Sequence, residues 1–313
     1  MFESLKAEYR SSLKSSDTEE NIDLAFYRPI GFAWACLFRK LGITPNAVTI
    51  ASIFIGVAAG ICFYPTDIWT NLLGMLLLIW ANSYDSADGQ LARLTKQYSR
   101  LGRILDGASG DFWFASIYIA IALRTNATVP FFMEHQWIIW AVAVAAGLCH
   151  AKQAATADYY RQFHLFFLKG AAGSELDSSA QLKEDLERLK AEGASPFRRI
   201  ALSTYYNYTR QQEQFTPAMQ RLRDHMRADC PDGQVPEPVR QEFLRLSFPL
   251  CKWENFMTFN WRTIFLFVSL LAGYPWLYFA AELTVFNAVL LMTRNRHERL
   301  CATVLNSLKS ASK

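Results

Sequence analysis

Long apolar blocks without any charged residue constrain the fold of this chain more than any other feature. Residues 48–64, 138–148 and 264–272 contain no Lys, Arg, Asp or Glu. Charged residues make up only 19% of the chain, below the share of about 25% that is usual in soluble domains. A soluble core would spread its apolar residues among polar positions, so the blocks indicate helices that lie in a lipid bilayer.

The lengths of the apolar segments indicate how often the chain crosses the membrane. A helix needs about 20 mainly apolar residues to cross a hydrocarbon layer of about 30 Å. The second and third of the six segments that approach this length carry aspartates at one end, which we expect to face water or protein instead of lipid. The sequence therefore predicts an all-α integral membrane protein with six spans. These are residues 46–64, 68–88, 106–123, 130–152, 257–274 and 275–293.

Basic residues gather on one side of the predicted spans. The connection at 89–105 contains four Lys or Arg, whereas 63–67 and 273–276 contain none. Cytoplasmic loops collect positive charge, so we expect both termini and the 89–105 connection to be cytoplasmic. We expect the protein in a bacterial inner (cytoplasmic) membrane, with its active site on the cytoplasmic side.

Two polar regions complete the predicted organisation. Residues 24–41 favour an amphipathic helix at the membrane surface. The long stretch between the fourth and fifth spans has helical patterns, such as Leu182, Leu186 and Leu189, and is interpreted as a helical insertion or a solvated appendage. The predicted regions are 1–45 with the amphipathic helix, 46–152 with spans one to four and the catalytic motif, 153–256 as the cytoplasmic insertion, 257–293 with spans five and six, and 294–313 as a cytoplasmic tail.

Three aspartates are spaced so that their carboxylates meet at the cytoplasmic ends of the second and third spans. Asp85 and Asp88 are three residues apart and share a helix face, and Asp106 begins the next span. Gathered carboxylates repel one another unless a cation neutralises them, and oxygen ligands suit Mg²⁺, Mn²⁺ or Ca²⁺. Gly89 leaves room for a close ligand, and Arg93 can bind phosphate oxygens with two donors. The sequence predicts a divalent-metal site for a diphosphate.

The same residues match the pattern D-x-x-D-G-x-x-A-R-(x)8-G-x-x-x-D, which resembles the signature of the CDP-alcohol phosphotransferase (CDP-alcohol phosphatidyltransferase) family. The resemblance covers about residues 24–152 and implies a six-span bundle, Mg²⁺ or Mn²⁺ held by the aspartates, and a CDP-activated donor. The matching positions are Asp85, Asp88, Gly89, Ala92, Arg93, Gly102 and Asp106. Of these, the aspartates are the expected metal ligands, and Gly89, Ala92, Arg93 and Gly102 are expected to bind the donor.

One position departs from the family pattern. The fourth aspartate of the family would fall at position 110, but this chain has Gly110 and then Asp111. On a regular helix Asp111 lies about 140° from Asp106, instead of about 40°. We expect a π-bulge near residues 107–110 that returns Asp111 to the shared face. The resemblance then implies that Asp111 is a fourth metal ligand and the catalytic base. The competing interpretation is a first-turn residue that the helix dipole favours.

The resemblance implies transfer of a phosphatidyl group from a CDP-alcohol, which we expect to be CDP-diacylglycerol, to an acceptor alcohol with release of CMP. Two alternatives stay open, namely headgroup transfer from a soluble CDP-alcohol to a diacylglycerol or ceramide hydroxyl, and a catalytically inactive membrane scaffold. A transporter is disfavoured because no repeats or paired broken helices are visible.

Lys152 and Arg161 would favour an anionic acceptor, or they extend to lipid headgroups. The sequence does not name the acceptor or decide whether the chain forms a homodimer. A net charge of +4 is too small to indicate nucleic acid.

Overall fold

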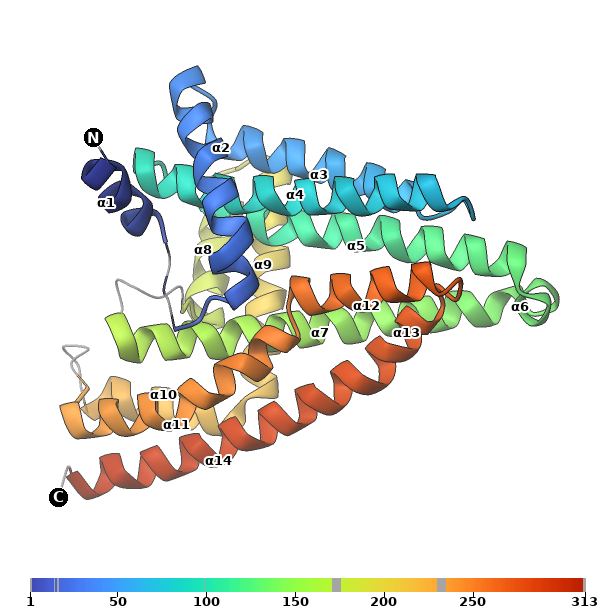
Figure 1. Cartoon of the computed structure of the whole chain (residues 1–313). Coiled ribbons are helices and arrows are strands. Elements are labelled where there is room, and N and C mark those ends of the chain that lie inside the picture. Colours follow the sequence, from blue (N-terminus) through green and yellow to red (C-terminus); the bar gives the residue numbers. More distant parts are fainter. Residues whose placement is uncertain are drawn as a thin grey trace. The chain divides into compact units, whose positions relative to one another are not determined.

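The computed structural model is helical, which confirms the all-α prediction (Figure 1). The structure describes residues 2–13, 15, 17–98, 100–170, 176–229 and 235–311, and it has no strand among them. The chain forms two compact units. Unit 1 comprises Met1–Ala151 and Phe259–Val285, and unit 2 comprises Lys152–Thr258 and Phe286–Lys313.

Unit 1 holds the helices that carry the predicted motif. Two of its elements, η1 and η3, are single π-helical turns. In chain order the elements are α1 (Phe2–Ser12), η1 (Asp23–Tyr27), α2 (Arg28–Leu41), α3 (Pro45–Ile61), α4 (Ile68–Thr95), α5 (Arg100–Thr128), α6 (Pro130–Glu134), the first part of α7 (Gln136–Lys169), α12 (Phe259–Leu271), α13 (Leu277–Ala281) and most of η3 (Glu282–Phe286).

The core of unit 1 is formed where α3, α4 and α5 lie side by side (Figure 1). Gly56 of α3 allows the closest approach, because a Cβ atom there would lie 2.1 Å from Cδ1 of Trp113 on α5. Small residues at helix contacts are typical of membrane bundles, where packing replaces the hydrophobic effect. This contact fixes α5, and with it Asp106, against α3.

Local signals set the helix boundaries near the motif. Asp67 caps α4, with its Oδ2 accepting from the Thr70 backbone N–H at 2.8 Å. Pro45 occupies the first turn of α3, where a missing N–H costs nothing. Gly42 ends α2 in the left-handed region, with φ of 69°.

The six predicted spans all fall on helices, but only some of these helices have the length and composition of a span. Among the described residues, Gln136–Lys169 and Leu277–Ser310 are long and apolar enough to cross a membrane, and Pro45–Ile61 is a shorter apolar helix. Helix α12 has only 13 residues. Crossing of a membrane by any of these helices, and therefore the count of six spans, stays a prediction.

The predicted amphipathic segment is helical as η1 and α2. Phe32, Ala35 and Phe38 are buried on one face, whereas Leu37 and Leu41 are exposed. The segment also contacts the C-terminal part of unit 1, since Asn260 Nδ2 of α12 donates to Asp23 Oδ1 at 2.8 Å.

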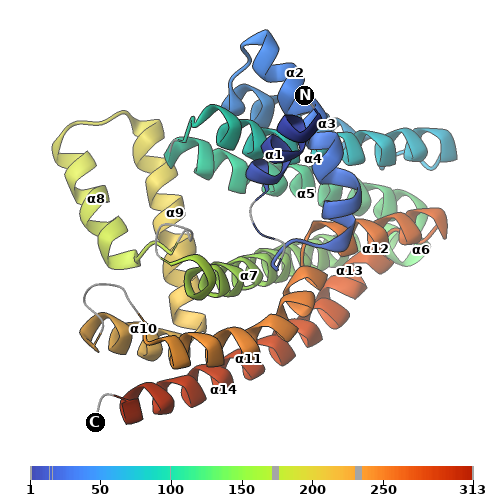
Figure 2. The same ribbon diagram turned by 60° about the vertical axis from the view of Figure 1, so that its left-hand side comes forward.

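Unit 2 contains the predicted insertion, and its described part is helical. Its core is formed by α7, α10, α11 and α14 around residues such as Phe163, Phe243 and Val304. Helices α8 and α9 pack against each other as a hairpin through Leu182, Leu186 and Leu202 (Figure 2). The elements are the rest of α7, α8 (Ser179–Ala191), α9 (Pro196–Phe215), α10 (Pro217–Asp229), α11 (Glu237–Phe256) and α14 (Asn287–Ala311).

Candidate metal centre

The structure brings together the three aspartates that the sequence singles out. One carboxylate oxygen from each of Asp85, Asp88 and Asp106 lies within 4.8 Å of the others. Helix α4 supplies Asp85 and Asp88, and α5 supplies Asp106. Asp88 is buried, Asp85 is half-buried and Asp106 is exposed, so the group is open on one side. Three oxygen donors with room for further ligands fit a divalent cation that completes its shell with phosphate oxygens.

Two hydroxyl groups from neighbouring helices orient the carboxylates of α4. Thr49 of α3 donates a short hydrogen bond from its Oγ1 to Asp88 Oδ2. Ser109 of α5 donates from its Oγ to Asp85 Oδ1 at 2.7 Å. Residues that orient metal ligands in this way contribute to metal affinity. Neither hydroxyl is predicted from the sequence, because a hydroxyl in an apolar helix gives no signal until its partner is known.

A positive charge lies beside the group on α2. Arg28 donates from Nη1 to Ser86 Oγ of α4 at 3.2 Å and pairs through Nε with Glu19 at 2.7 Å. Ser86 lies between the two aspartates of α4 in the sequence. The amphipathic segment therefore contributes a cation next to the carboxylates, which the motif alone does not indicate.

Arg93 is engaged by the N-terminal helix. Its guanidinium lies over Gly89, where an added Cβ atom would be 3.5 Å from Nη2. Its Nε donates to the backbone carbonyl of Ser12, at the end of α1, at 2.5 Å. Gln90 Nε2 donates to Ser12 Oγ at 3.0 Å. Burial lowers the pKa of Arg93, and the charge of Arg28 lowers it further.

The remaining two predicted donor-binding residues flank this region. Ala92 lies on α4 next to Arg93, and Gly102 lies in the first turn of α5, and both are half-buried. Donor binding by Gly89, Ala92, Arg93 and Gly102 stays a prediction.

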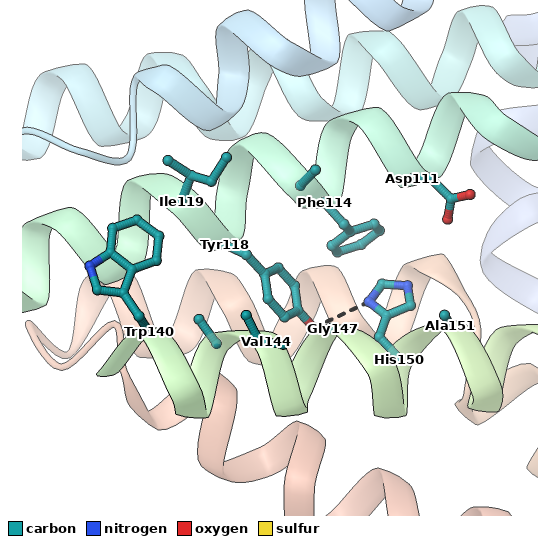
Figure 3. A pocket seen from close by; sticks show the side chains of 11 residues that line it. Asp111, Phe114, Tyr118, Ile119, Trp140, Val144, Gly147, His150 and Ala151 are labelled. Carbon is teal, nitrogen blue, oxygen red and sulfur yellow. Dashed lines mark hydrogen bonds between the residues drawn. The ribbon is translucent and has the colours of Figure 1, made fainter. Parts of the chain in front are cut away.

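The predicted π-bulge is wrong. Helix α5 is α-helical from Arg100 to Thr128, and the two named π-helical turns are η1 and η3, at residues 23–27 and 282–286. Glycines at 107 and 110 permit a bulge but do not force one, because an uninterrupted helix keeps every backbone hydrogen bond of the ladder. Asp111 is exposed and does not join the group of three aspartates. It lines a separate cavity between α5 and α7 (Figure 3).

Lys152 and Arg161 contact other residues of unit 2. Lys152 Nζ donates to the Gln211 carbonyl at 3.2 Å and lies over the Phe215 ring. Arg161 is 4.0 Å from Asp158 on the same helix. Both side chains thus have structural partners, and a role in acceptor binding stays a prediction.

Comparison with known proteins agrees with this geometry. Residues 42–168 match the sequence pattern of the CDP-alcohol phosphatidyltransferase family. An archaetidylinositol phosphate synthase of Pyrococcus horikoshii is 37% identical over 84 residues, which are 27% of this chain and 43% of that relative. The alignment thus spans less than half of the length of the relative. The matched segment includes all the motif residues, and it confirms the resemblance that they carry.

Proposed function

Because residues 42–168 match the CDP-alcohol phosphatidyltransferase family, we propose that the chain is a membrane enzyme that transfers a phosphatidyl group from a CDP-alcohol to an acceptor alcohol. The observation that carries this proposal is the group formed by Asp85, Asp88 and Asp106, with carboxylate oxygens within 4.8 Å of one another. Hydrogen bonds from Thr49 and Ser109 keep two of these carboxylates directed toward the group.

The three aspartates fit Mg²⁺ or Mn²⁺, since both prefer carboxylate oxygens and leave positions for phosphate. A cation bound there supplies positive charge against the diphosphate of the donor. Arg93, Gly89, Ala92 and Gly102 form the proposed donor surface next to it. Arg28 of α2, which pairs with Glu19, lies beside the group and can donate a hydrogen bond to a phosphate oxygen.

CDP-diacylglycerol is the proposed donor. The name of the relative describes synthesis of an archaetidylinositol phosphate, which is a lipid product and supports transfer of the lipid-bearing half. The acceptor oxygen forms a bond to the β-phosphorus, the bond from this phosphorus to the bridging oxygen breaks, and CMP leaves with that oxygen. The hydroxyl proton must pass to a base. Asp111 is the predicted base, but on the regular α5 it would have to act from about 140° around the helix.

The proposed location of the protein is a bacterial inner membrane, with the active site on the cytoplasmic side. The chain is proposed to cross this membrane six times, with both termini and the insertion in the cytoplasm. The apolar helices Gln136–Lys169 and Leu277–Ser310 support a membrane location. The basic connection at 89–105 supports the orientation.

One observation favours a second candidate, the inactive scaffold. Gly110 occupies the place of the fourth aspartate of the family, and α5 does not bulge to bring Asp111 there. A protein of this kind would keep the donor site but lack a base.

Release of CMP by the purified protein tests the proposal. CDP-diacylglycerol and Mg²⁺ are supplied with a panel of alcohols, and the Asp85→Asn variant is the matched control. We expect the wild-type protein to release CMP with at least one alcohol, and the Asp85→Asn variant to release none. A label in the lipid half of CDP-diacylglycerol should appear in the product. If the product is labelled only when a soluble CDP-alcohol carries the label, the reaction is headgroup transfer. No CMP with any donor, alcohol or metal would refute the enzyme and favour the scaffold.

A further inference from the structure

A groove of about 290 Å³ lies between α5 and α7 in unit 1 (Figure 3). None of the three clustered aspartates lines it. Asp111 and Asp106 are about 140° apart around α5, so the groove lies on a different face from the candidate metal centre. Apart from Asp111, whose role as the base stays a prediction, the groove shares no residue with the proposed transfer site.

The groove has the shape of a channel along the two helices. Asp111, Ala115 and Ile119 follow one another at intervals of four residues on α5, which extends the lining over about 12 Å of the helix. Small residues leave the space, with Ala115 on α5 and Gly147 on α7. A channel of this length can hold part of an extended hydrocarbon chain.

The rim of the groove is apolar and exposed. The side chains of Ile119 and Val144 are 50% and 61% exposed, and α7 is one of the helices that are apolar and long enough to cross a membrane. In a bilayer these rim residues meet lipid, so the groove is open to the acyl chains around the protein.

The end of the groove near the start of α5 is polar. Asp111 and His150 face it from the two helices (Figure 3), and His150 Nδ1 is 3.2 Å from the Tyr118 hydroxyl. Behind His150, the buried Arg262 pairs with Glu282 at 2.5 Å, so its charge is neutralised. The lining itself contains an aspartate and no Lys or Arg.

This charge pattern selects among lipid headgroups. A phosphate or carboxylate at this end would meet the Asp111 carboxylate with no lining cation to offset the repulsion. An uncharged hydroxyl can donate to Asp111 and also bond to the imidazole of His150. The groove therefore matches a lipid alcohol better than an anionic phospholipid.

We propose that this groove binds a membrane lipid with an uncharged hydroxyl headgroup, of the diacylglycerol class. Its chain lies along α5 and α7, and its hydroxyl lies between Asp111 and His150. The inference rests on the membrane location within the proposed function, but it needs no transfer activity. The bound lipid is a resident of the groove and not the acceptor, because the groove faces away from the clustered aspartates.

Photo-cross-linking tests the inference on the full-length protein in vesicles. The probes are a diacylglycerol and a phosphatidic acid that carry the same diazirine acyl chain. We expect the diacylglycerol to label peptides of α5 and α7 about tenfold more strongly, since like charges oppose the phosphate. Asp111→Lys should reverse this preference, because its ammonium attracts the phosphate. Equal labelling by both probes, or an unchanged preference in Asp111→Lys, would overturn the headgroup assignment.

A matched pair of variants tests the groove itself. Ala115→Leu fills the channel at an exposed position, and Ala145→Leu makes the same change at an exposed position of α7 that does not line it. Labelling should fall about tenfold only in Ala115→Leu. Equal loss in both variants, or no loss in either, would refute the lipid site. CMP release should be unaltered by Ala115→Leu, and a raised KM for an acceptor would contradict the separation from the transfer site.

Discussion

Thr49 and Ser109 show that the aspartates of α4 depend on hydroxyl groups from α3 and α5. Each aspartate must accept a hydrogen bond and still direct a second oxygen toward the other carboxylates. At this scale the signature motif is incomplete, because it names the carboxylates and leaves out the two hydroxyl groups that orient them. Thr49 lies 36 residues before Asp85 in an apolar segment.

Replacing a clustered aspartate should abolish transfer without unfolding the protein. Asp85→Asn, Asp88→Asn and Asp106→Asn should each lower turnover by at least about 100-fold, because positive charge at the diphosphate is lost. CMP release measures turnover, and circular dichroism measures folding. Asp67→Asn is a suitable control, because asparagine also caps a helix. Near-normal turnover in any of the three cluster variants would refute the metal assignment.

Thr49→Val should weaken metal binding more than it alters the maximal rate. Valine has nearly the same shape but cannot donate to Asp88, and loss of such an orienting bond lowers metal affinity by about tenfold or more. Turnover is measured against Mg²⁺ concentration, with Thr49→Ser as the variant that keeps the hydroxyl. An identical Mg²⁺ dependence in Thr49→Val and wild type would show that the bond is not needed.

Gly110→Asp and Asp111→Asn separate the two candidate positions of the base. A Cβ atom at Gly110 meets no neighbour within 4 Å, and an aspartate there lies about 40° from Asp106 on the regular helix. We expect Gly110→Asp to raise turnover. Asp111→Asn should cost less than the roughly 100-fold that loss of a general base causes. Abolished transfer in Asp111→Asn, with donor binding retained, would instead establish Asp111 as the base.

At the scale of elements, hydropathy and spacing predicted the helices and the meeting of Asp85, Asp88 and Asp106. These features follow from periodicity, which is local. The sequence did not predict the contact of α1 with Arg93, because that contact joins residues 81 positions apart through a backbone carbonyl. The prediction of a π-bulge in α5 was wrong for a related reason. Glycine shows where a helix is permissive, but tertiary packing decides whether it deforms.

The contact between α3 and α5 gives a prediction at the same scale. Gly56→Ala places a methyl group against Trp113 and should destabilise the protein by about 1–3 kcal/mol through overpacking. Gly107→Ala meets nothing within 4 Å and should stabilise it by about 1 kcal/mol at most, through helix propensity. Apparent melting temperatures in one detergent measure both. A Gly56→Ala protein as stable as wild type would show that α3 and α5 are not packed at this point.

At the scale of the molecule, the compact units differ from the predicted regions mainly in the C-terminal helix. Boundaries after Ala151 and after Thr258 lie close to the predicted limits, whereas a further boundary falls after Val285, inside η3. Hydropathy placed the limits near residues 152 and 256, where composition changes. Hydropathy could not group residues 286–313 with the insertion, because that grouping depends on packing between α10, α11 and α14.

Accessibility labelling tests the topology of the whole chain. A cysteine at Ser179, in a variant without the native cysteines, should react with a membrane-impermeant maleimide only when the cytoplasmic face is open. A cysteine at Asp67 should react from the opposite side, because 63–67 contains no basic residue. Labelling at position 179 in intact cells would overturn the orientation.

The hydrogen bond from Arg93 to the Ser12 carbonyl makes ligand binding at this arginine an exchange. An oxygen that accepts a hydrogen bond from Nε must first displace the Ser12 carbonyl, so the affinity measured through this donor is a difference between two bonds and not the strength of one. Shortening the chain before residue 13 would remove the competitor. The N-terminal helix, which lies outside the family motif, therefore competes with a ligand for one of the donors of the guanidinium.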